Sequence, residues 1–208
     1  MTTFVSIGPY CITADILKKY KLRDSAYPFD YIYSSLEMVS HCIRDEFNMF
    51  LNKDHHTQCH HSPVSSKHTY YQKFLDTPLM EQHLQHHYKD ASLFLHHNII
   101  NEDTYNAFKR RTKRLIHLLH SGKKVVFVYY NCYTNSCEDL VNFYKIFFDK
   151  TNIFILGIYE NDHAKKVLYE HDRCKIYQNY DVKYALHETM TNFRDGNIKC
   201  PFCYSNIG

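Results

Sequence analysis

The sequence has no tryptophan, and glycine and proline occur only five times each in its 208 residues. So few turn-forming residues argue against a low-complexity, collagen-like or largely disordered chain. Apolar residues make up 44% of the sequence and aromatic residues 16%, which is enough to bury a sizeable core. The length suits one domain, or one domain with an inserted segment.

The sequence also lacks a strong excess of charge and any long hydrophobic run. Its net charge of +3 is smaller than a duplex-binding protein normally carries, so we expect no nucleic-acid partner. No run approaches the roughly 18 apolar residues that span a bilayer, and the first residues show no basic, apolar leader. These absences predict a cytoplasmic protein without a membrane partner. Its eight cysteines are then expected to be reduced, metal-bound or catalytic rather than paired in disulfides.

Apolar runs alternate with amphipathic segments along the chain, most regularly in its second half. Runs that are apolar at every position are typical of strands buried on both faces, which indicates a parallel sheet covered by helices. We therefore predict a single α/β domain with a mostly parallel sheet. The expected strands are Phe4–Ile7, Leu93–Leu95, Lys124–Tyr130, Asn152–Tyr159 and Arg173–Tyr177, and the expected helices are Thr13–Tyr20, Ser34–Leu51, Asn101–His120, Glu138–Asp149, Asp162–Tyr169 and Val182–Phe193.

Two segments fall outside this pattern. Residues 52–66 hold four histidines and Cys59 but almost nothing apolar, so we predict a His-rich loop or insertion whose metal binding would be adventitious. The tail, residues 196–208, contains Cys200 and Cys203 in C-x-x-C spacing. This pair is half of a zinc site, a redox pair or an ordinary reduced tail, and the sequence leaves the three open. No other cofactor is implied.

The run Lys109–Arg114 contains five basic residues, a composition that is also found in nucleic-acid-binding segments. On the expected helix, however, Phe108, Thr112 and Leu115 face inward, so most of these charges are predicted to form a solvated face.

Cys11 follows the first expected strand and the turn Gly8–Tyr10, at or just before the start of a helix. The free N–H groups at a helix N-terminus stabilise a thiolate, and cysteines there can have a pKa of about 3.5 to 7.5. The same groups can serve as an oxyanion hole. Cys11 is therefore the candidate nucleophile, and the alternative is a small buried cysteine at a strand–helix junction.

The segment Phe4–Ser35 resembles the opening of a papain-like cysteine peptidase family found in bacteria and large DNA viruses. The residues that carry the resemblance are Ser6, Gly8, Cys11, Ala14, Leu22, Arg23, Ser25, Pro28, Phe29 and Asp30, with Tyr31 in place of the family's usual tryptophan. Phe94–His97 is similar to the family's F-x-H-[DH] motif, and Tyr105–Tyr130, with Arg110 and Arg111, is similar to a later helix and strand.

The resemblance implies a cysteine peptidase or isopeptidase that acts on a protein or peptide without a cofactor. In that family Cys11 would be the nucleophile, His96 its base and Asp30 the carboxylate that orients the imidazole. Asn98, Asn131 and Asp162 are further candidates for the orienting role, and Asp30 can equally be a turn or capping residue. For a viral protein, the compartment would be the host cytoplasm.

Two alternatives belong to other classes of protein. One is a non-enzymatic module that binds a partner protein, with an inert Cys11. The other is a carbohydrate or nucleotide-sugar enzyme in which Cys11 is structural. Papain-like enzymes also join a helical part to an antiparallel sheet, whereas the pattern here predicts a parallel one, so fold analogy alone does not assign the function.

Overall fold

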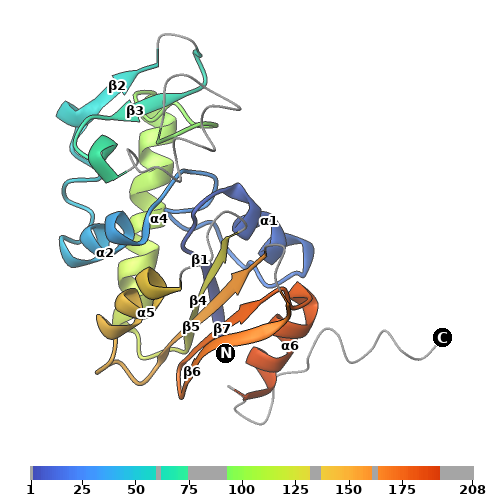
Figure 1. The fold of residues 1–208 in the computed structure, drawn as a ribbon. Coiled ribbons are helices and arrows are strands. Elements are labelled where there is room, and N and C mark those ends of the chain that lie inside the picture. The colour runs from blue at the N-terminus through green and yellow to red at the C-terminus, as the bar shows by residue number, and fades with distance from the viewer. Residues whose placement is uncertain (1, 60–61, 75–92, 132–136, 161–163, 193–208) are drawn as a thin grey trace.

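The computed structural model describes residues 2–59, 62–74, 93–131, 137–160 and 164–192. Five strands form the main sheet and two short strands form a second one (Figure 1). The elements are β1 Thr3–Ser6, α1 Cys11–Lys19, α2 Leu36–Arg44, η1 Lys53–His55, β2 His56–Gln58, β3 Ser66–His68, η2 Gln72–Phe74, α4 Glu102–His120, β4 Val125–Asn131, α5 Glu138–Lys145, β5 Ile153–Tyr159, β6 Lys166–His171, β7 Cys174–Gln178 and α6 Val182–Asn192.

The main sheet has the strand order β1-β4-β5-β7-β6. β1, β4, β5 and β7 are parallel neighbours, and β6 pairs antiparallel with β7 at one edge. The central strands β4 and β5 are buried along their whole length, as expected for strands covered on both faces. The structure therefore confirms an α/β fold with a mostly parallel sheet.

Helices cover both faces of this sheet, and the side chains of β4 alternate between them. Val125 and Phe127 belong to one buried cluster with residues of α4 and α5, whereas Val126 and Val128 belong to a second cluster with residues of α1 and α6. This alternation follows from the two-residue period of a strand. It places the helix that begins at Cys11 on the α6 face and α4 on the opposite face.

The predicted His-rich loop over residues 52–66 is more regular than we expected. Its described part contains η1 and β2, and β2 pairs antiparallel with β3. The ring of His56 contacts those of His68 and Phe94 at centroid distances of 5.2 and 6.1 Å. The histidines thus supply aromatic packing surface that a count of apolar residues does not register. In Figure 1 this hairpin lies at the N-terminal end of α4, where the Tyr105 hydroxyl donates to the Leu51 carbonyl at 3.0 Å.

The helix predicted over Asp162–Tyr169 is wrong, because residues 166–171 form β6. This strand pairs with β7 from Lys166↔Gln178 to His171↔Cys174. Its exposed and half-buried side chains are typical of an edge strand, which has no strong two-residue hydrophobic period to distinguish it from a helix. The short strand predicted at Leu93–Leu95 reduces to a single bridge between Ser66 and Phe94.

The second predicted helix ends early, at Arg44 instead of Leu51. The carboxylate of Asp45 accepts hydrogen bonds from the backbone N–H groups of Phe47 and Met49, at 3.0 and 2.9 Å. Such local bonds compete with the helical pattern. Glu46 and Phe47 accordingly take positive φ angles of 53° and 64°.

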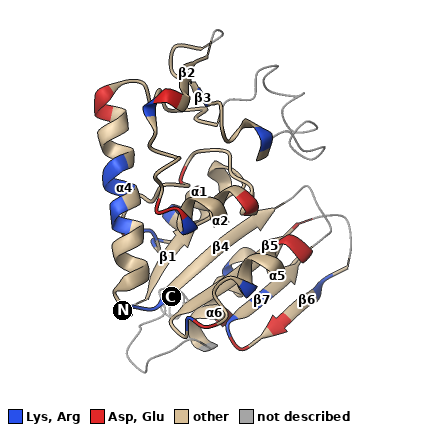
Figure 2. Ribbon diagram, turned by 90° about the vertical axis from the view of Figure 1, so that its left-hand side faces the viewer, with Lys and Arg blue, Asp and Glu red and all other residues tan. Residues whose placement is uncertain are grey.

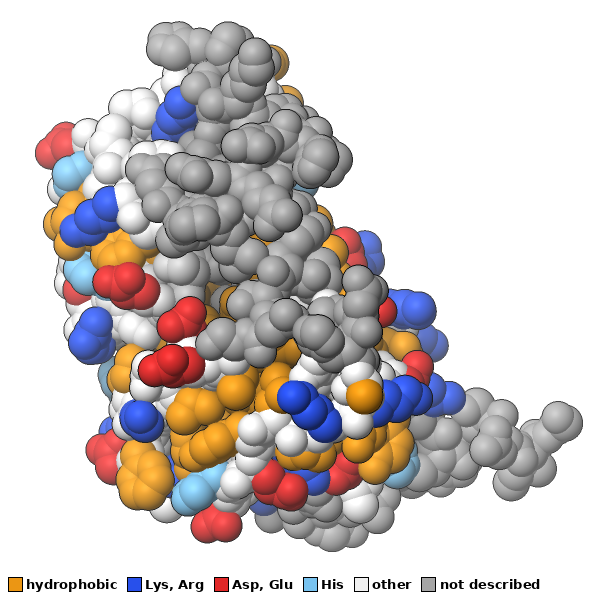
Figure 3. Space-filling view, in the orientation of Figure 1, with side chains coloured by type: hydrophobic (Ala, Val, Ile, Leu, Met, Phe, Trp, Pro, Cys, Tyr) orange, Lys and Arg blue, Asp and Glu red, His pale blue; other side chains and the backbone are white. Residues whose placement is uncertain are grey.

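The surface of α4 agrees in large part with the predicted solvated face. Lys109, Arg110 and Lys113 are exposed, and basic residues colour the middle of α4 in Figure 2. Arg111 is different, since it is half-buried. Figure 3 shows hydrophobic side chains gathered over α5 and β6. Val167 of β6 is 39% exposed, and Phe148, whose ring contacts those of Tyr144 in α5 and His171 in β6, is 57% exposed. Of the helices in the described ranges, none is long and apolar enough to cross a membrane.

Candidate active site

Cys11 is the first residue of α1, directly after the turn that follows β1. No side-chain hydrogen bond caps this end of the helix. The half-buried sulfur accepts hydrogen bonds from the backbone N–H groups of Cys11 and Ile12. These bonds favour the thiolate and so act to lower the pKa of the thiol. The sulfur thus lies at the carboxyl edge of the sheet beside N–H groups that can stabilise a negative charge.

Hydrogen bonds from three segments fix the turn before Cys11. The Thr13 hydroxyl donates to the Gly8 carbonyl at 2.6 Å, and the Tyr130 N–H of β4 donates to that hydroxyl at 3.3 Å. The Ser34 hydroxyl donates to the Ile7 carbonyl at 3.4 Å. These contacts explain why the position of Cys11 is determined by β4 and by the segment before α2, as well as by its own neighbours.

Gly8 is required by this turn, and we expect Gly8→Ala to destabilise the fold. Gly8 has a φ of +101°, and a Cβ there would lie 2.1 Å from the Ser34 Oγ. The backbone strain alone costs about 1–3 kcal/mol, and the clash adds to it. Gly122→Ala is the matched control, since Gly122 has a φ of +68° but nothing within 4 Å of a Cβ. Denaturant unfolding should show a clearly larger loss for Gly8→Ala. Equal losses would mean that Ser34 moves aside freely.

The resting thiol of Cys11 is not the thiolate that its position suggested. Burial raises the pKa of Cys11 above its usual 9.0, and the carboxylate of Asp15, one turn along α1, raises it further. Together these two effects outweigh the lowering by the N–H groups of the helix. The Tyr31 hydroxyl holds Asp15 with a hydrogen bond of 2.7 Å to Oδ1. The Arg23 guanidinium lies 5.5 Å from the Tyr31 ring centroid. The expectation of a lowered pKa is therefore wrong for the resting protein.

Asp30 is buried, with 1% of its side chain exposed. Its Oδ2 accepts hydrogen bonds from the Arg23 Nε and from the Tyr27 N–H, both at 2.9 Å. Burial raises the pKa of Asp30, while Tyr27, Arg23 and the more distant Arg111 oppose the rise. The carboxylate closes the turn of residues 27–30 and pairs with Arg23. In the part of the chain that the structure describes, its hydrogen bonds do not include an imidazole.

The two histidines of the Phe94–His97 motif differ in environment. His96 is exposed, whereas His97 is half-buried with its ring 5.3 Å from that of Phe108. Burial and the nearby Arg111 lower the pKa of His97 to about 4. The structure thus turns His97 toward Arg111 and the interior. Within the described residues, neither ring is hydrogen-bonded to the Cys11 thiol or to Asp30.

Of the other candidates for the orienting role, Asn131 is the better placed. It is buried at the carboxyl end of β4, the neighbour of β1, and its Nδ2 donates to the Tyr129 hydroxyl at 3.0 Å. Asn98 has a different role. Its Nδ2 donates to the Gln58 side chain at 2.8 Å and its Oδ1 accepts from the Ile100 N–H at 3.1 Å, so it fixes a turn beside the hairpin.

The remaining predicted site residues, Asp162, Cys200 and Cys203, lie outside the described residues. Five cysteines are described and all are free thiols: Cys11, Cys42, Cys59, Cys137 and Cys174. In the described ranges, no group of three or more His, Cys, Asp or Glu side chains is arranged to hold a metal ion. The zinc prediction for the tail therefore stays a prediction.

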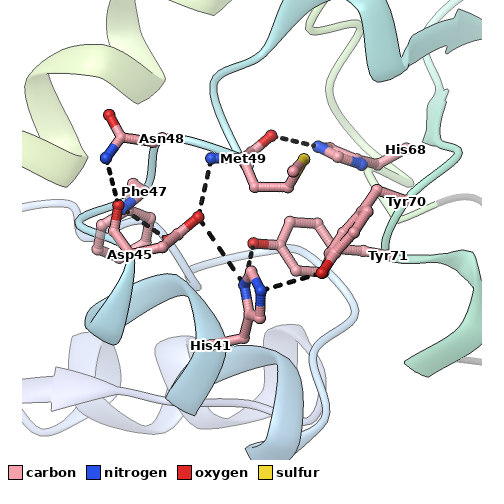
Figure 4. A network of polar contacts seen from close by, with 8 residues as sticks. All are labelled: His41, Asp45, Phe47, Asn48, Met49, His68, Tyr70 and Tyr71. Atoms are coloured by element: carbon pink, nitrogen blue, oxygen red, sulfur yellow. Dashed lines mark hydrogen bonds and ion pairs between the residues drawn. The ribbon is translucent and has the colours of Figure 1, made fainter.

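A polar network that the sequence did not suggest connects α2 to the segment after β3 (Figure 4). The ring nitrogens of His41 lie 3.0 Å from the Tyr71 hydroxyl and 3.1 Å from the Tyr70 hydroxyl. The Asp45 carboxylate is 3.9 Å from the His41 Nδ1. The Tyr71 hydroxyl also bonds the thiol of Cys42, whose pKa is raised by burial.

This network combines a thiol, an imidazole and a carboxylate, yet it is built for structure. Cys42 and Tyr71 are both fully buried, so no substrate reaches the thiol. Their hydrogen bonds satisfy buried polar groups between α2 and the hairpin region. A spacing of about 30 residues between His41 and the two tyrosines left no local sequence signal for it.

The family model described as "Putative papain-like cysteine peptidase" matches residues 2–149. The chain belongs to this family. The matched part runs from β1 through α5 and includes Cys11, Asp30 and His96. No curated protein and no solved structure matches the chain.

Proposed function

We propose that this protein is a cysteine-dependent hydrolase, a peptidase or isopeptidase whose nucleophile is Cys11. The observation that carries the proposal is the half-buried sulfur at the first residue of α1, facing the backbone N–H groups of Cys11 and Ile12. Family membership supports the same chemistry. The substrate class is a protein or peptide, and the reaction needs no cofactor.

In the proposed reaction a base removes the proton of Cys11 as the sulfur attacks the substrate carbonyl. The N–H groups at the start of α1 stabilise the resulting oxyanion. The protonated base then gives its proton to the leaving amine, and a water molecule hydrolyses the thioester. Because the pKa of Cys11 is raised at rest, deprotonation has to accompany attack, as for a serine nucleophile.

The proposed base is His96, by its position in the family motif. It is exposed, so its ring can approach a substrate bound over α1 without breaking internal contacts. His97 is the competing imidazole. Asp30 is the candidate for the carboxylate that orients the imidazole, by its position in the family motif. Its Oδ2 already accepts hydrogen bonds from Arg23 and Tyr27, so Oδ1 would be the atom that accepts the imidazole N–H.

The first test is the rate of Cys11 alkylation by iodoacetamide between pH 5 and 9, together with hydrolysis of a pool of fluorogenic peptides. Cys137 is a built-in control, because it is also half-buried at the start of a helix, α5. Because the pKa of Cys11 is raised, we expect alkylation of Cys11 to be slow at pH 7 and to increase toward pH 9. Peptide hydrolysis at pH 7 should be abolished in Cys11→Ser and slowed by about 100-fold or more in His96→Ala. Loss of activity in His97→Ala but not in His96→Ala would reassign the base.

Asp15→Asn sharpens this test. Removing the carboxylate that raises the pKa of Cys11 should increase the alkylation rate of Cys11 at pH 7, since more of the thiol is then ionised. Asp24→Asn, an exposed carboxylate on the loop after α1, is the matched control and should change nothing. A wild-type protein that hydrolyses none of the peptides, or a Cys11→Ser variant that hydrolyses them equally fast, would contradict the hydrolase.

One observation favours a second function, a non-enzymatic module that binds a partner protein. This observation is the raised pKa of Cys11, which suits an inert thiol. In that case Cys11→Ser should leave every measurable property of the protein unchanged except its alkylation.

A further inference from the structure

Arg111 of α4 and His97, from the segment before that helix, lie against the same aromatic ring. The guanidinium carbon of Arg111 lies 4.8 Å from the centroid of the Phe108 ring, and the His97 ring lies 5.3 Å from the same centroid. Phe108 itself is fully buried. The two basic groups therefore share one apolar support.

Each of these groups has a buried polar atom without a hydrogen-bond partner. In the part of the chain described, Arg111 Nη1 and His97 Nε2 are both shielded from solvent and unbonded. An unbonded donor in such a position costs free energy, because it has lost its water and gained nothing in return. Both residues are only half-buried overall, so the two shielded nitrogens lie close to the surface, and a ligand reaches them by displacing the groups that cover them.

The local charge balance is positive. Asp30 is the carboxylate that acts on Arg111, but its Oδ2 is occupied by Arg23 and the Tyr27 N–H. The positive charge of Arg111 is repelled by the neighbouring guanidinium groups of Arg23, Arg110 and Arg114. One carboxylate thus faces several arginines, which leaves Arg111 short of negative charge.

We propose that Arg111 and His97 form a binding site for one small oxyanion, the carboxylate or phosphate group of a ligand. The Nη1–H of Arg111 and the Nε2–H of a neutral His97 each donate to an oxygen of this group. A guanidinium is suited to both kinds of anion because its planar N–H donors match their geometry. The anion satisfies two unbonded donors and offsets the uncompensated charge of Arg111.

The test measures binding of phosphate and of acetate to the whole protein at pH 7, with chloride at matched ionic strength as the reference. The readout is the His97 ring signal in a proton–nitrogen NMR spectrum, together with the melting temperature. We expect a saturable shift of the His97 signal and a higher melting temperature with at least one of the two anions. The anion with the smaller dissociation constant identifies the ligand as a phosphate or a carboxylate.

Arg111→Gln and Arg110→Gln form the matched pair of variants, since Arg110 is the exposed neighbour on the same helix. Arg111→Gln should weaken binding about tenfold or more, and Arg110→Gln should weaken it much less. Equal effects would mean general screening of the basic helix and would overturn the site. If Arg111→Gln does not fold, the wild-type titration decides: a His97 signal that responds to neither anion overturns the proposal and leaves a bridging water.

Discussion

Asp30→Ala is expected to lower the free energy of unfolding by about 3–5 kcal/mol, the loss typical of breaking a buried ion pair from one side. Asp30 is 1% exposed and its partner Arg23 18% exposed, with a distance of 2.9 Å between them. Removing the carboxylate leaves Arg23 and the half-buried Arg111 without their shared counter-charge. It also removes the acceptor for the Tyr27 N–H. Urea unfolding at pH 7 measures the loss.

Asp24→Ala is the control for this prediction, because Asp24 is an exposed carboxylate on the same loop, where substitutions usually change stability by less than about 0.5 kcal/mol. Asp30→Asn separates a structural role from a catalytic one. If Asp30 orients the catalytic imidazole, Asp30→Asn should reduce peptide hydrolysis far more than it reduces stability. If Asp30 only holds Arg23, Asp30→Asn should reduce peptide hydrolysis in proportion to the loss of stability. A stable Asp30→Ala protein would contradict the ion pair as a determinant of the fold.

The sheet could be predicted from the sequence because its central strands are apolar at every position. β4, Val125–Asn131, and β5, Ile153–Tyr159, agree with the predicted strands to within one residue at each end. β6 was missed because an edge strand buries little, so its residues show no clear period. The early end of α2 depends on the carboxylate of Asp45, which bonds to backbone groups further along the chain. Short side-chain bonds of this kind are not visible in hydrophobic periodicity.

The candidate site was predicted in part. The strand–turn–helix that presents Cys11 follows from local sequence, but the state of the thiol does not, because it depends on burial and on Asp15. Likewise, His96 and His97 are adjacent in sequence and only the fold shows which one faces Arg111. The main sheet is mostly parallel, whereas papain-like enzymes join a helical part to an antiparallel sheet. The family's name therefore does not describe the fold of this chain. Any shared chemistry has to be argued from the side chains themselves.

Acid is expected to destabilise the protein through His68, which is fully buried. Its Nε2 lies 3.1 Å from the Met49 carbonyl, and its ring lies 5.6 and 5.2 Å from those of His55 and His56. Burial, and next the neighbouring His56, lower the pKa of His68 from 6.5 to about 4. The folded state therefore favours the neutral ring, whereas the unfolded chain binds a proton near pH 6.5. The contribution of the neutral His68 ring to the free energy of unfolding is fully present above pH 6.5. It is lost as the pH falls toward 4, and the total loss is about 3 kcal/mol.

The change that isolates this effect is His68→Gln, because a glutamine amide can still donate to the Met49 carbonyl and does not titrate. Unfolding by denaturant at pH 7 and at pH 4.5 should show a smaller acid loss for His68→Gln than for the wild type. The variant should not lose all acid sensitivity, since burial also lowers the pKa of His56 and His97. His117→Gln, at an exposed position on α4, should behave like the wild type. An unchanged acid loss in His68→Gln would mean that the hairpin opens before His68 is protonated, and would place the acid-sensitive step elsewhere in the fold.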